Sequence, residues 1–193
     1  MTDDVTIREA TPQDAEQLIA HVHRVAAEPD IDLVLMPGEF KVTVEEERKF
    51  LADHAAADNS SVFVAEAAGR LVGVVVCTGG TRRALRHAAT LGITVAKDWR
   101  GRGVGSRLVA RAVEWARGTG VVTRIELTVF VRNEAARRVY EKLGFVVEGR
   151  RRNAVCRDGV YFDDFVMALT GKGPEPPLGA ATHRSRSIRR TSG

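Results

Sequence analysis

The sequence is poor in cysteine, and its two cysteines stand far apart. Among 193 residues only Cys77 and Cys156 carry a thiol, with no C-x-x-C spacing. A disulfide framework needs an even set of paired cysteines, and a structural zinc site needs clustered cysteine or histidine ligands. We therefore expect neither, predict no metal, and interpret both side chains as buried packing or free thiols.

Long apolar runs are also missing. No segment approaches the roughly 20 apolar residues that a membrane-spanning helix requires. The acidic start, Met1–Asp4, lacks the basic and apolar parts of a signal peptide. We therefore expect a cytoplasmic protein without a membrane partner.

The net charge is small and unevenly placed. The formal charge of +4 is carried entirely by residues 171–193, a segment rich in Pro, Ser and Arg, so the body up to Thr170 is neutral overall. We divide the chain into one domain, 1–170, and a disordered basic tail, 171–193. Such a tail can contact nucleic acid weakly through charge, but a solvated extension is the simpler interpretation.

What the sequence does contain is a strand, a glycine-rich loop and a helix in direct succession. The apolar run Leu91–Val95 is typical of a strand, and Arg100–Gly105 reads R-G-R-G-V-G before an amphipathic helix. The first N–H groups of a helix lack partners within it and carry the positive end of its dipole. Glycines let a phosphate approach those donors closely. The pattern predicts an anion site, although an isolated G-x-G-x-G loop is a weak signal.

A second segment adds to this signal. From Ile125 to Phe145 the chain predicts a strand, then a helix that Asn133 can cap and that Gly144 ends. Tyr140 follows Asn133 by about two helical turns, on the same side of the helix. By periodicity alone, Tyr140 is a core residue on the apolar stripe of that helix.

Two motifs together resemble the coenzyme A site of the GNAT (Gcn5-related) N-acetyltransferases: Val95-x4-Arg100-Gly101-x-Gly103-x-Gly105 and Asn133-x6-Tyr140-x-x-x-Gly144-Phe145. The resemblance covers roughly residues 5–169. It implies an α/β (α+β) fold of the GNAT acyl-CoA N-acyltransferase type, with a mixed central sheet of about six or seven strands and flanking helices. It also implies acetyl-CoA as co-substrate. Many relatives pair as dimers, so a homodimer stays open.

Hydrophobic periodicity and turn residues place the other elements. Strands are expected at residues 5–10, 61–66, 71–77, 88–95, 124–130, 145–152 and 160–169. Helices are expected after Thr11-Pro12, after the capping box Thr43-x-x-Glu46, from about Val104 to Arg117, and after Asn133. Residues 31–42 and 153–159 are interpreted as loops.

The resemblance implies roles for particular residues. The sheet would splay after the strand ending at Val95, so that backbone groups there pair with the pantetheine arm, as in strand addition. The pyrophosphate would sit on backbone amides of the glycine loop. Tyr140 would also act as the general acid toward the leaving thiolate. The implied cofactor-binding positions are Ile93, Thr94, Val95, Arg100, Gly101, Arg102, Gly103, Val104, Gly105, Ser106, Asn133 and Tyr140.

No motif defines the general base. Some peptide-acetylating relatives carry a glutamate at the position of Thr128, whereas here the acid is Glu126, two residues earlier on the same strand face. Glu126 is our candidate, acting through a water, and an ion pair with Arg124 is the competing interpretation. His87 is a further candidate. The acidic run after Thr43 is interpreted as a solvated helix face: Glu45, Glu46 and Glu47.

Other functions use similar features. A dinucleotide-binding oxidoreductase needs G-x-G-x-x-G, which fails here at Leu108, and a P-loop needs a Gly-Lys-Ser/Thr that does not follow. A non-catalytic acyl-CoA-binding or regulatory module, whose tail contacts nucleic acid, stays open. We predict an N-acetyltransferase that moves an acetyl group from acetyl-CoA to a primary amine by direct transfer in a ternary complex. The acceptor, a small molecule or a protein N-terminus, has no defining motif.

Overall fold

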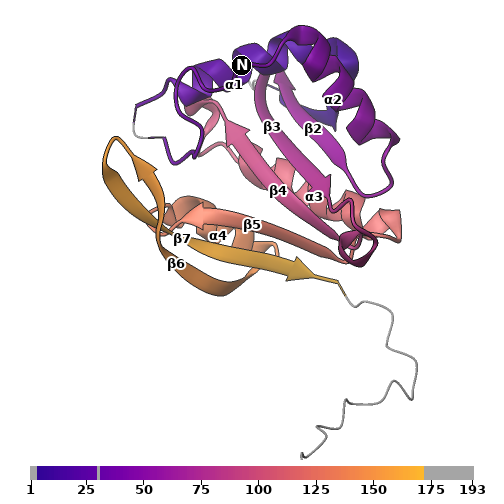
Figure 1. Ribbon diagram of the computed structural model, residues 1–193. Coiled ribbons are helices and arrows are strands. Elements are labelled where there is room, and N and C mark those ends of the chain that lie inside the picture. The colour runs from indigo at the N-terminus through magenta and orange to yellow at the C-terminus, as the bar shows by residue number, and fades with distance from the viewer. Residues whose placement is uncertain (1–3, 30, 172–193) are drawn as a thin grey trace, which may run out of the picture.

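A computed structural model describes residues 4–29 and 31–171 as a seven-stranded sheet with four α-helices (Figure 1). The strands are β1 (Thr6–Glu9), β2 (Ser61–Ala67), β3 (Arg70–Gly79), β4 (Ala88–Val95), β5 (Arg124–Phe130), β6 (Val146–Arg157) and β7 (Val160–Thr170). The helices are α1 (Ala15–Ala26), α2 (Val44–Ala56), α3 (Val104–Thr119) and α4 (Glu134–Lys142). The mixed α/β sheet with flanking helices is confirmed. Except for Gly171, the predicted tail lies outside the described residues.

The sheet consists of two halves that meet at a short junction. Its strand order is β1-β2-β3-β4-β5-β7-β6, and only β4 and β5 run parallel. Their ladder has three pairs, from Ala88–Arg124 to Thr90–Glu126. Beyond Thr90, β4 pairs only with β3, and β5 continues only with β7. The two halves therefore diverge into the open V seen between β4 and β5 in Figure 1.

Helices cover the first half of the sheet on both faces. Figure 1 shows α1 and α2 on one side of β2–β4 and α3 on the other. On the α1/α2 side, Leu18 and Leu51 pack against Val64 and Val74. The larger core on the α3 side joins both halves and includes Val75, Leu91, Leu108, Val109, Leu127, Val129, Tyr140 and Phe145. None of the helices in residues 4–29 and 31–171 is long and apolar enough to cross a membrane.

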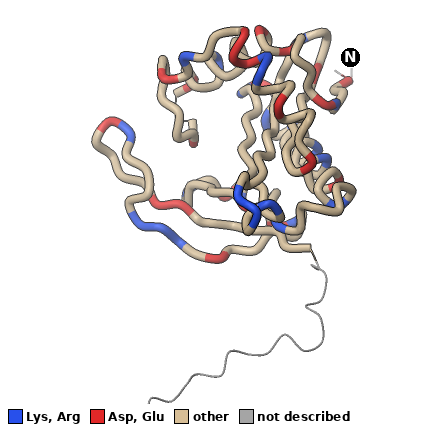
Figure 2. The backbone as a smooth tube through the Cα atoms, turned by 45° about the vertical axis from the view of Figure 1, so that its right-hand side comes forward, with Lys and Arg blue, Asp and Glu red and all other residues tan. Residues whose placement is uncertain are grey.

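The β6–β7 hairpin is longer than predicted. We expected a loop at 153–159, but β6 continues to Arg157 and only the Asp158–Gly159 turn separates it from β7. Cross-strand ion pairs hold the charged stretch of β6, because Arg150 and Arg151 bind Asp163 and Asp164 on β7. The irregular pairing between Arg151 and Val155 absorbs a left-handed Asn153 (φ 52°). The arginine run Arg150–Arg152 is the long blue stretch on the hairpin in Figure 2.

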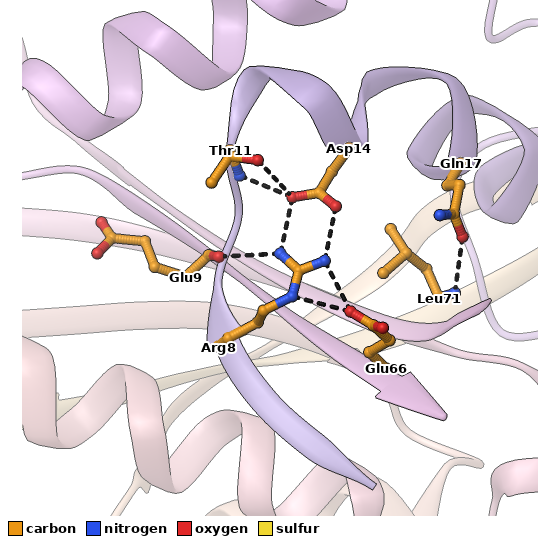
Figure 3. Close-up of polar contacts among 7 residues, drawn as sticks. All are labelled: Arg8, Glu9, Thr11, Asp14, Gln17, Glu66 and Leu71. Atoms are coloured by element: carbon orange, nitrogen blue, oxygen red, sulfur yellow. Dashed lines mark hydrogen bonds and ion pairs between the residues drawn. The ribbon is translucent and has the colours of Figure 1, made fainter. Parts of the chain in front are cut away.

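A partly buried ion-pair network fixes the corner where β1 turns toward α1 (Figure 3). The Arg8 guanidinium donates to both carboxylate oxygens of Asp14, at 2.8 and 2.7 Å, and to Glu66 at 2.9 Å. The backbone N–H of Thr11 donates to the same Asp14 carboxylate at 2.8 Å. These hydrogen bonds, chiefly that from Arg8, lower the pKa of Asp14. The network therefore stabilises the fold most when Asp14 is ionised.

Candidate active site

The glycine loop before α3 leaves backbone donors available. Gly101 and Gly103 have left-handed φ values of 72° and 79°, which favour glycine, and Gly103 caps α3. The N–H groups of residues 103–106 donate no hydrogen bond within the described part of the chain. The first turn of α3 also contains no acidic residue. This helix end therefore offers donors and a positive dipole to an anion such as a pyrophosphate.

Arg100 and Arg107, which flank this loop, bind other parts of the protein. Arg100 donates from Nε to the Val95 carbonyl at 2.9 Å and forms an ion pair with Glu28, which follows α1. Glu28 also accepts the backbone N–H of Lys97 at 3.0 Å. The Arg107 guanidinium donates to the Val5 carbonyl at 2.8 Å. Sequence reasoning missed Glu28, which anchors the loop to the end of α1.

Arg102 lies over an aromatic ring beside the same loop. Its guanidinium carbon is 5.2 Å from the ring centroid of Trp99, a cation–π distance. This stacking keeps a positive charge next to the donors of α3. The predicted cofactor positions from Arg100 to Ser106 thus come together around one helix end.

The predicted pantetheine edge lies where the sheet opens. The strands part already after Thr90, so the β5-facing edge of residues 91–95 has no strand partner within the described chain. We expected the sheet to splay beside the strand ending at Val95 and to free backbone groups at Ile93–Val95; the ladder between β4 and β5 ends at Thr90, which leaves this stretch without a partner on β5. The backbone of Ile93, Thr94 and Val95 therefore borders the V and can pair with an extended ligand.

Tyr140 and Asn133 keep their structural roles. The Asn133 side chain accepts the N–H of Ala136 at 3.0 Å and so caps α4. Tyr140 is buried in the α3-side core, 5.9 Å from the Phe145 ring between centroids. Its hydroxyl forms no hydrogen bond within the described residues, and burial raises its pKa to about 12. The phenol therefore stays protonated at neutral pH.

Glu126 stands at the junction of the two sheet halves. It occupies the last pair of the β4–β5 ladder, opposite Thr90. Arg124 Nε donates to its carboxylate at 3.2 Å, so the ion pair expected as the competing interpretation is present. The same guanidinium binds Glu148 on β6. Thr128, two residues on, is exposed.

Two buried histidines were missed by sequence reasoning. His21 is 1% exposed, and its Nε2 lies 3.0 Å from Thr94 Oγ1 on β4. Arg24 donates to His21 Nδ1 at 3.3 Å, so Nδ1 is the acceptor and Nε2–H donates to Thr94. Burial, aided by the Arg24 charge, lowers the His21 pKa to about 4. His54 on α2 is also buried, and its Nε2 lies 3.0 Å from Thr78 Oγ1.

The acidic run on α2 divides into different roles. Glu46 completes the capping box with Thr43, and Glu45 forms an ion pair with Arg48. Glu47 is only 4% exposed, and burial raises its pKa. The expectation of a solvated face is therefore wrong for Glu47, whose spacing from Leu51 places it on the inward stripe. The candidate base His87 is exposed in the loop before β4.

Loop residues after α1 connect the two halves of the sheet across the V. Arg157, at the end of β6, donates to the carbonyls of Ile31 and Leu33. Arg132, which follows β5, binds Asp32 at 2.5 Å and lies over the Phe162 ring. We call these contacts the clasp. In Figure 1 the hairpin of β6 and β7 reaches toward this loop.

The described chain shows no cluster that suits a metal ion. In residues 4–29 and 31–171, no group of three or more His, Cys, Asp or Glu could hold one. The polar groups around the V are instead backbone amides, hydroxyls, imidazoles and paired carboxylates. The backbone amides at the start of α3 and along the open edge of β4 suit a negatively charged, extended organic ligand.

Comparisons with known proteins agree with this geometry. A sequence model of the acetyltransferase (GNAT) family matches residues 18–145. An L-amino acid N-acetyltransferase of Escherichia coli is 40% identical over 100 residues, which are 52% of this chain and 62% of that protein. The aligned part is thus less than two thirds of that relative's length.

Solved structures show the same architecture. An acetyltransferase of the GNAT family from Streptococcus pneumoniae is 36% identical, with a TM-score of 0.84 over 86% of this chain and 99% of that one. A Salmonella typhimurium protein described as a putative acetyltransferase with its cofactor acetyl-CoA is 19% identical, with a TM-score of 0.78 over 90% and 98% of the two chains. The latter shows the fold alone. The chain belongs to the acetyltransferase (GNAT) family.

Proposed function

We propose that the chain transfers an acetyl group from acetyl-CoA to the α-amino group of an L-amino acid or a closely similar primary amine. The observation that carries this proposal is the junction of the sheet. The β4–β5 ladder ends at Thr90–Glu126, and a helix N-terminus with free amides follows β4. The E. coli relative named for L-amino acids supports the acceptor class.

The glycine loop and the open edge of β4 would hold acetyl-CoA at its two ends. The amides of residues 103–106 would bind the pyrophosphate, with the charges of Arg100 and Arg102 beside it. The backbone of Ile93–Val95 would pair with the pantetheine amides. Asn133 would face the same ligand from the start of α4. Bound in this way, acetyl-CoA supplies an acetyl group already activated as a thioester.

Tyr140 would assist the departing thiol. Its pKa of about 12 makes the phenol a weaker acid than a thiol, whose pKa is near 8.5. The hydroxyl therefore stabilises a developing thiolate by donating a hydrogen bond rather than by giving up its proton completely. When the attacking amine becomes an amide it releases a proton, and this proton converts the leaving thiolate to the free thiol. Glu126 would contribute negative charge on the acceptor side of the junction.

Direct transfer requires both reactants to be held together. Correct placement of two reactants lowers a barrier by up to about 7 to 11 kcal/mol. In the proposed arrangement the acyl donor would lie against β4, and the α1/α2 face would be left for the amine. No covalent enzyme intermediate is needed in this arrangement, so initial rates should follow a sequential rather than a ping-pong pattern.

The test is a panel of amines with acetyl-CoA, read as free thiol. It contains the twenty L-amino acids, two D-amino acids, a polyamine, an aminoglycoside and a peptide with a free N-terminus. We expect thiol release with L-amino acids and an N-acetylated product of the correct mass. Acetyl-CoA without an amine is the control. If acetyl-CoA binds but no amine gives product, the proposed function is wrong and a non-catalytic acyl-CoA-binding module is favoured.

A further inference from the structure

A row of polar side chains crosses three strands at the junction. Thr78 on β3 pairs with Thr90 on β4, which pairs with Glu126 on β5. Residues directly opposite each other carry their side chains on the same face, and neighbouring strands lie about 4.8 Å apart. The row therefore spans about 10 Å. The His54 contact with Thr78 places it on the face that carries α1 and α2.

This row is open to a ligand. Thr78 and Thr90 are both exposed. Gly92, the next residue of β4 on the same face, is also exposed, and a Cβ added there would meet nothing within 4 Å. Thr128, the next residue of β5 on this face, is exposed as well. The sheet surface on the acceptor side of the V is thus polar and accessible.

His54 is fixed in one tautomer at the end of this row. Its Nδ1 lies 2.9 Å from the Phe50 carbonyl oxygen, which can only accept, so Nδ1 carries the proton. In the neutral imidazole, Nε2 is then an acceptor, and the Thr78 hydroxyl donates to it at 3.0 Å. The Phe50 ring lies 3.9 Å from the imidazole, between centroids, and restrains it further. The hydroxyl of the exposed residue Thr78 therefore connects the buried imidazole to the row of polar side chains.

We propose that His54, acting through Thr78, takes the proton that the acceptor ammonium must lose before it attacks acetyl-CoA. The ammonium N–H bond breaks as its proton binds Thr78 Oγ1, while the hydroxyl's own proton moves to His54 Nε2. The products are a neutral amine with a free electron pair and an imidazolium. This inference rests on the proposed function.

The pair accommodates both protonation states without moving heavy atoms. Once His54 is charged, both ring nitrogens donate, and Thr78 Oγ1 becomes the acceptor. Thr78 touches the acceptor in this scheme, whereas His54 acts through it. At the far end of the row, the Glu126 carboxylate attracts the ammonium group.

No charged side chain competes for His54 within the described residues. Its contacts there are Phe50 and Thr78. The titratable groups on the surrounding elements are Glu47, on the same buried stripe of α2, the Lys49–Asp53 pair and the Arg86–Asp58 pair. None of these groups bonds to the imidazole within the described residues, so the proton that His54 gains can return through Thr78 to solvent.

The test compares Thr78→Val, Thr78→Ser and His54→Gln with wild type, using the best L-amino acid from the panel between pH 6 and 9.5. We expect Thr78→Val and His54→Gln to lower kcat at least tenfold at pH 7. The deficit should shrink at least threefold by pH 9.5, because more of the amine is already neutral. Thr78→Ser keeps a hydroxyl and should stay within threefold of wild type. The Kd of acetyl-CoA should change less than twofold throughout.

Each other outcome overturns the relay. Wild-type kcat in Thr78→Val at pH 7 removes the hydroxyl from the reaction. An equal loss at every pH, or an equal loss in Thr78→Ser, indicates packing alone. If His54→Gln does not fold, the Val and Ser variants of Thr78 decide the question. If the wild-type protein binds acetyl-CoA but acetylates no amine, the proposed function itself is refuted. If the wild type is active and the variants have the same kcat, only the relay is refuted, so the two failures can be distinguished.

Discussion

The ring and the hydroxyl of Tyr140 have different surroundings, so their contributions can be tested separately. Its ring is part of the core, whereas its hydroxyl has no hydrogen-bond partner among the described residues. Tyr140→Phe should therefore leave the melting temperature nearly unchanged. We expect kcat to fall tenfold or more, with the acetyl-CoA Kd within twofold of wild type. Steady-state kinetics and calorimetry measure both values.

Tyr161→Phe is the matched control for this substitution. Tyr161 is the other tyrosine of the sequence, and it is 63% exposed on β7. Its loss should change neither kcat nor acetyl-CoA binding. Equal activity of Tyr140→Phe and wild type would remove Tyr140 from the mechanism.

His21 should make stability depend on pH. Its folded pKa of about 4 lies below the ordinary value near 6.5, so protonation favours the unfolded chain. The stabilisation is complete above pH 6.5 and is lost as pH falls toward 4, by about 3 kcal/mol in total. Urea unfolding of wild type and His21→Gln across this window measures the difference. If the free energy of unfolding changed with pH in the same way in both proteins, His21 would not be the source of the pH dependence.

His23→Gln is the control for the pH dependence of the unfolding free energy. His23 lies two positions away on α1 but is exposed, and its Nε2 donates to the Phe40 carbonyl at 2.8 Å. This variant should retain the pH dependence of wild type. Carboxylates with lowered pKa, such as Asp14, act in both proteins and cancel in the comparison.

Single side chains were the hardest features to predict. Tyr140 and Asn133 were found because a motif spacing marked them, and the structure brings them to the core and the start of α4. His21, His54 and Glu47 were missed, because a helical stripe is recognised from apolar residues. Their spacings from Leu18 and Leu51 were the available signal. Spacing cannot show which hydroxyl a buried imidazole reaches.

The start of α3 can be tested as an element through its cap. Gly103 has φ 79°, and a Cβ there would meet no atom within 4 Å. Gly103→Val should therefore act through backbone strain, of the order of 1 to 3 kcal/mol, rather than through a clash. We expect the Kd of acetyl-CoA to rise at least tenfold, measured by calorimetry. Normal affinity would contradict the phosphate-loop assignment.

Gly118→Ala on the same helix is the control. Gly118 has an ordinary helical φ and open space around it. Alanine should stabilise α3 by up to about 1 kcal/mol, because it loses less conformational entropy on folding. Acetyl-CoA affinity should remain that of wild type. A loss of binding here would indicate general sensitivity of α3.

At the scale of elements, boundaries followed from caps and turns. Thr43 with Glu46 marked the start of α2, and glycines marked both ends of α3. The end of β6 was mispredicted because Arg150–Arg152 and Asn153 break the alternation of apolar and polar residues. Their strand conformation depends on aspartates across the hairpin, a tertiary contact that local pattern does not encode.

At the scale of the whole molecule, the clasp connects the two halves of the sheet across the V. Arg157→Ala removes the donor to the Ile31 and Leu33 carbonyls. We expect the KM of the amino-acid acceptor to rise at least fivefold, because the loop no longer borders its side of the V, while the acetyl-CoA Kd stays within twofold. Initial-rate kinetics with each substrate varied separate these effects. An unchanged acceptor KM would show that the clasp does not shape the acceptor side.

Arg152→Ala is the corresponding control. Arg152 lies on the same strand and is exposed. Its removal lowers the positive charge of β6 by the same amount as Arg157→Ala but leaves the clasp in place. Acceptor KM should therefore remain that of wild type. A similar rise in both variants would point to charge rather than to the clasp.

The family and the general architecture could be predicted because the two motifs follow directly after β4 and β5, the strands that flank the opening. The exact point of divergence could not, since Leu91–Val95 and Leu127–Phe130 are apolar enough to continue a ladder. Where pairing stops is a property of the assembled sheet, in which β4 continues only with β3 and β5 only with β7 beyond the junction. The polar contacts of the clasp likewise join residues 100 to 126 positions apart.

The hairpin also provides a natural handle for spectroscopy. Cys77 is fully buried, and burial raises its pKa to about 12, so it resists alkylation at neutral pH. Cys156 is exposed and immediately precedes Arg157. A maleimide dye should consequently attach at a single position of the native protein, beside the clasp. Its emission would report any change in the surroundings of the clasp during turnover, without an engineered cysteine.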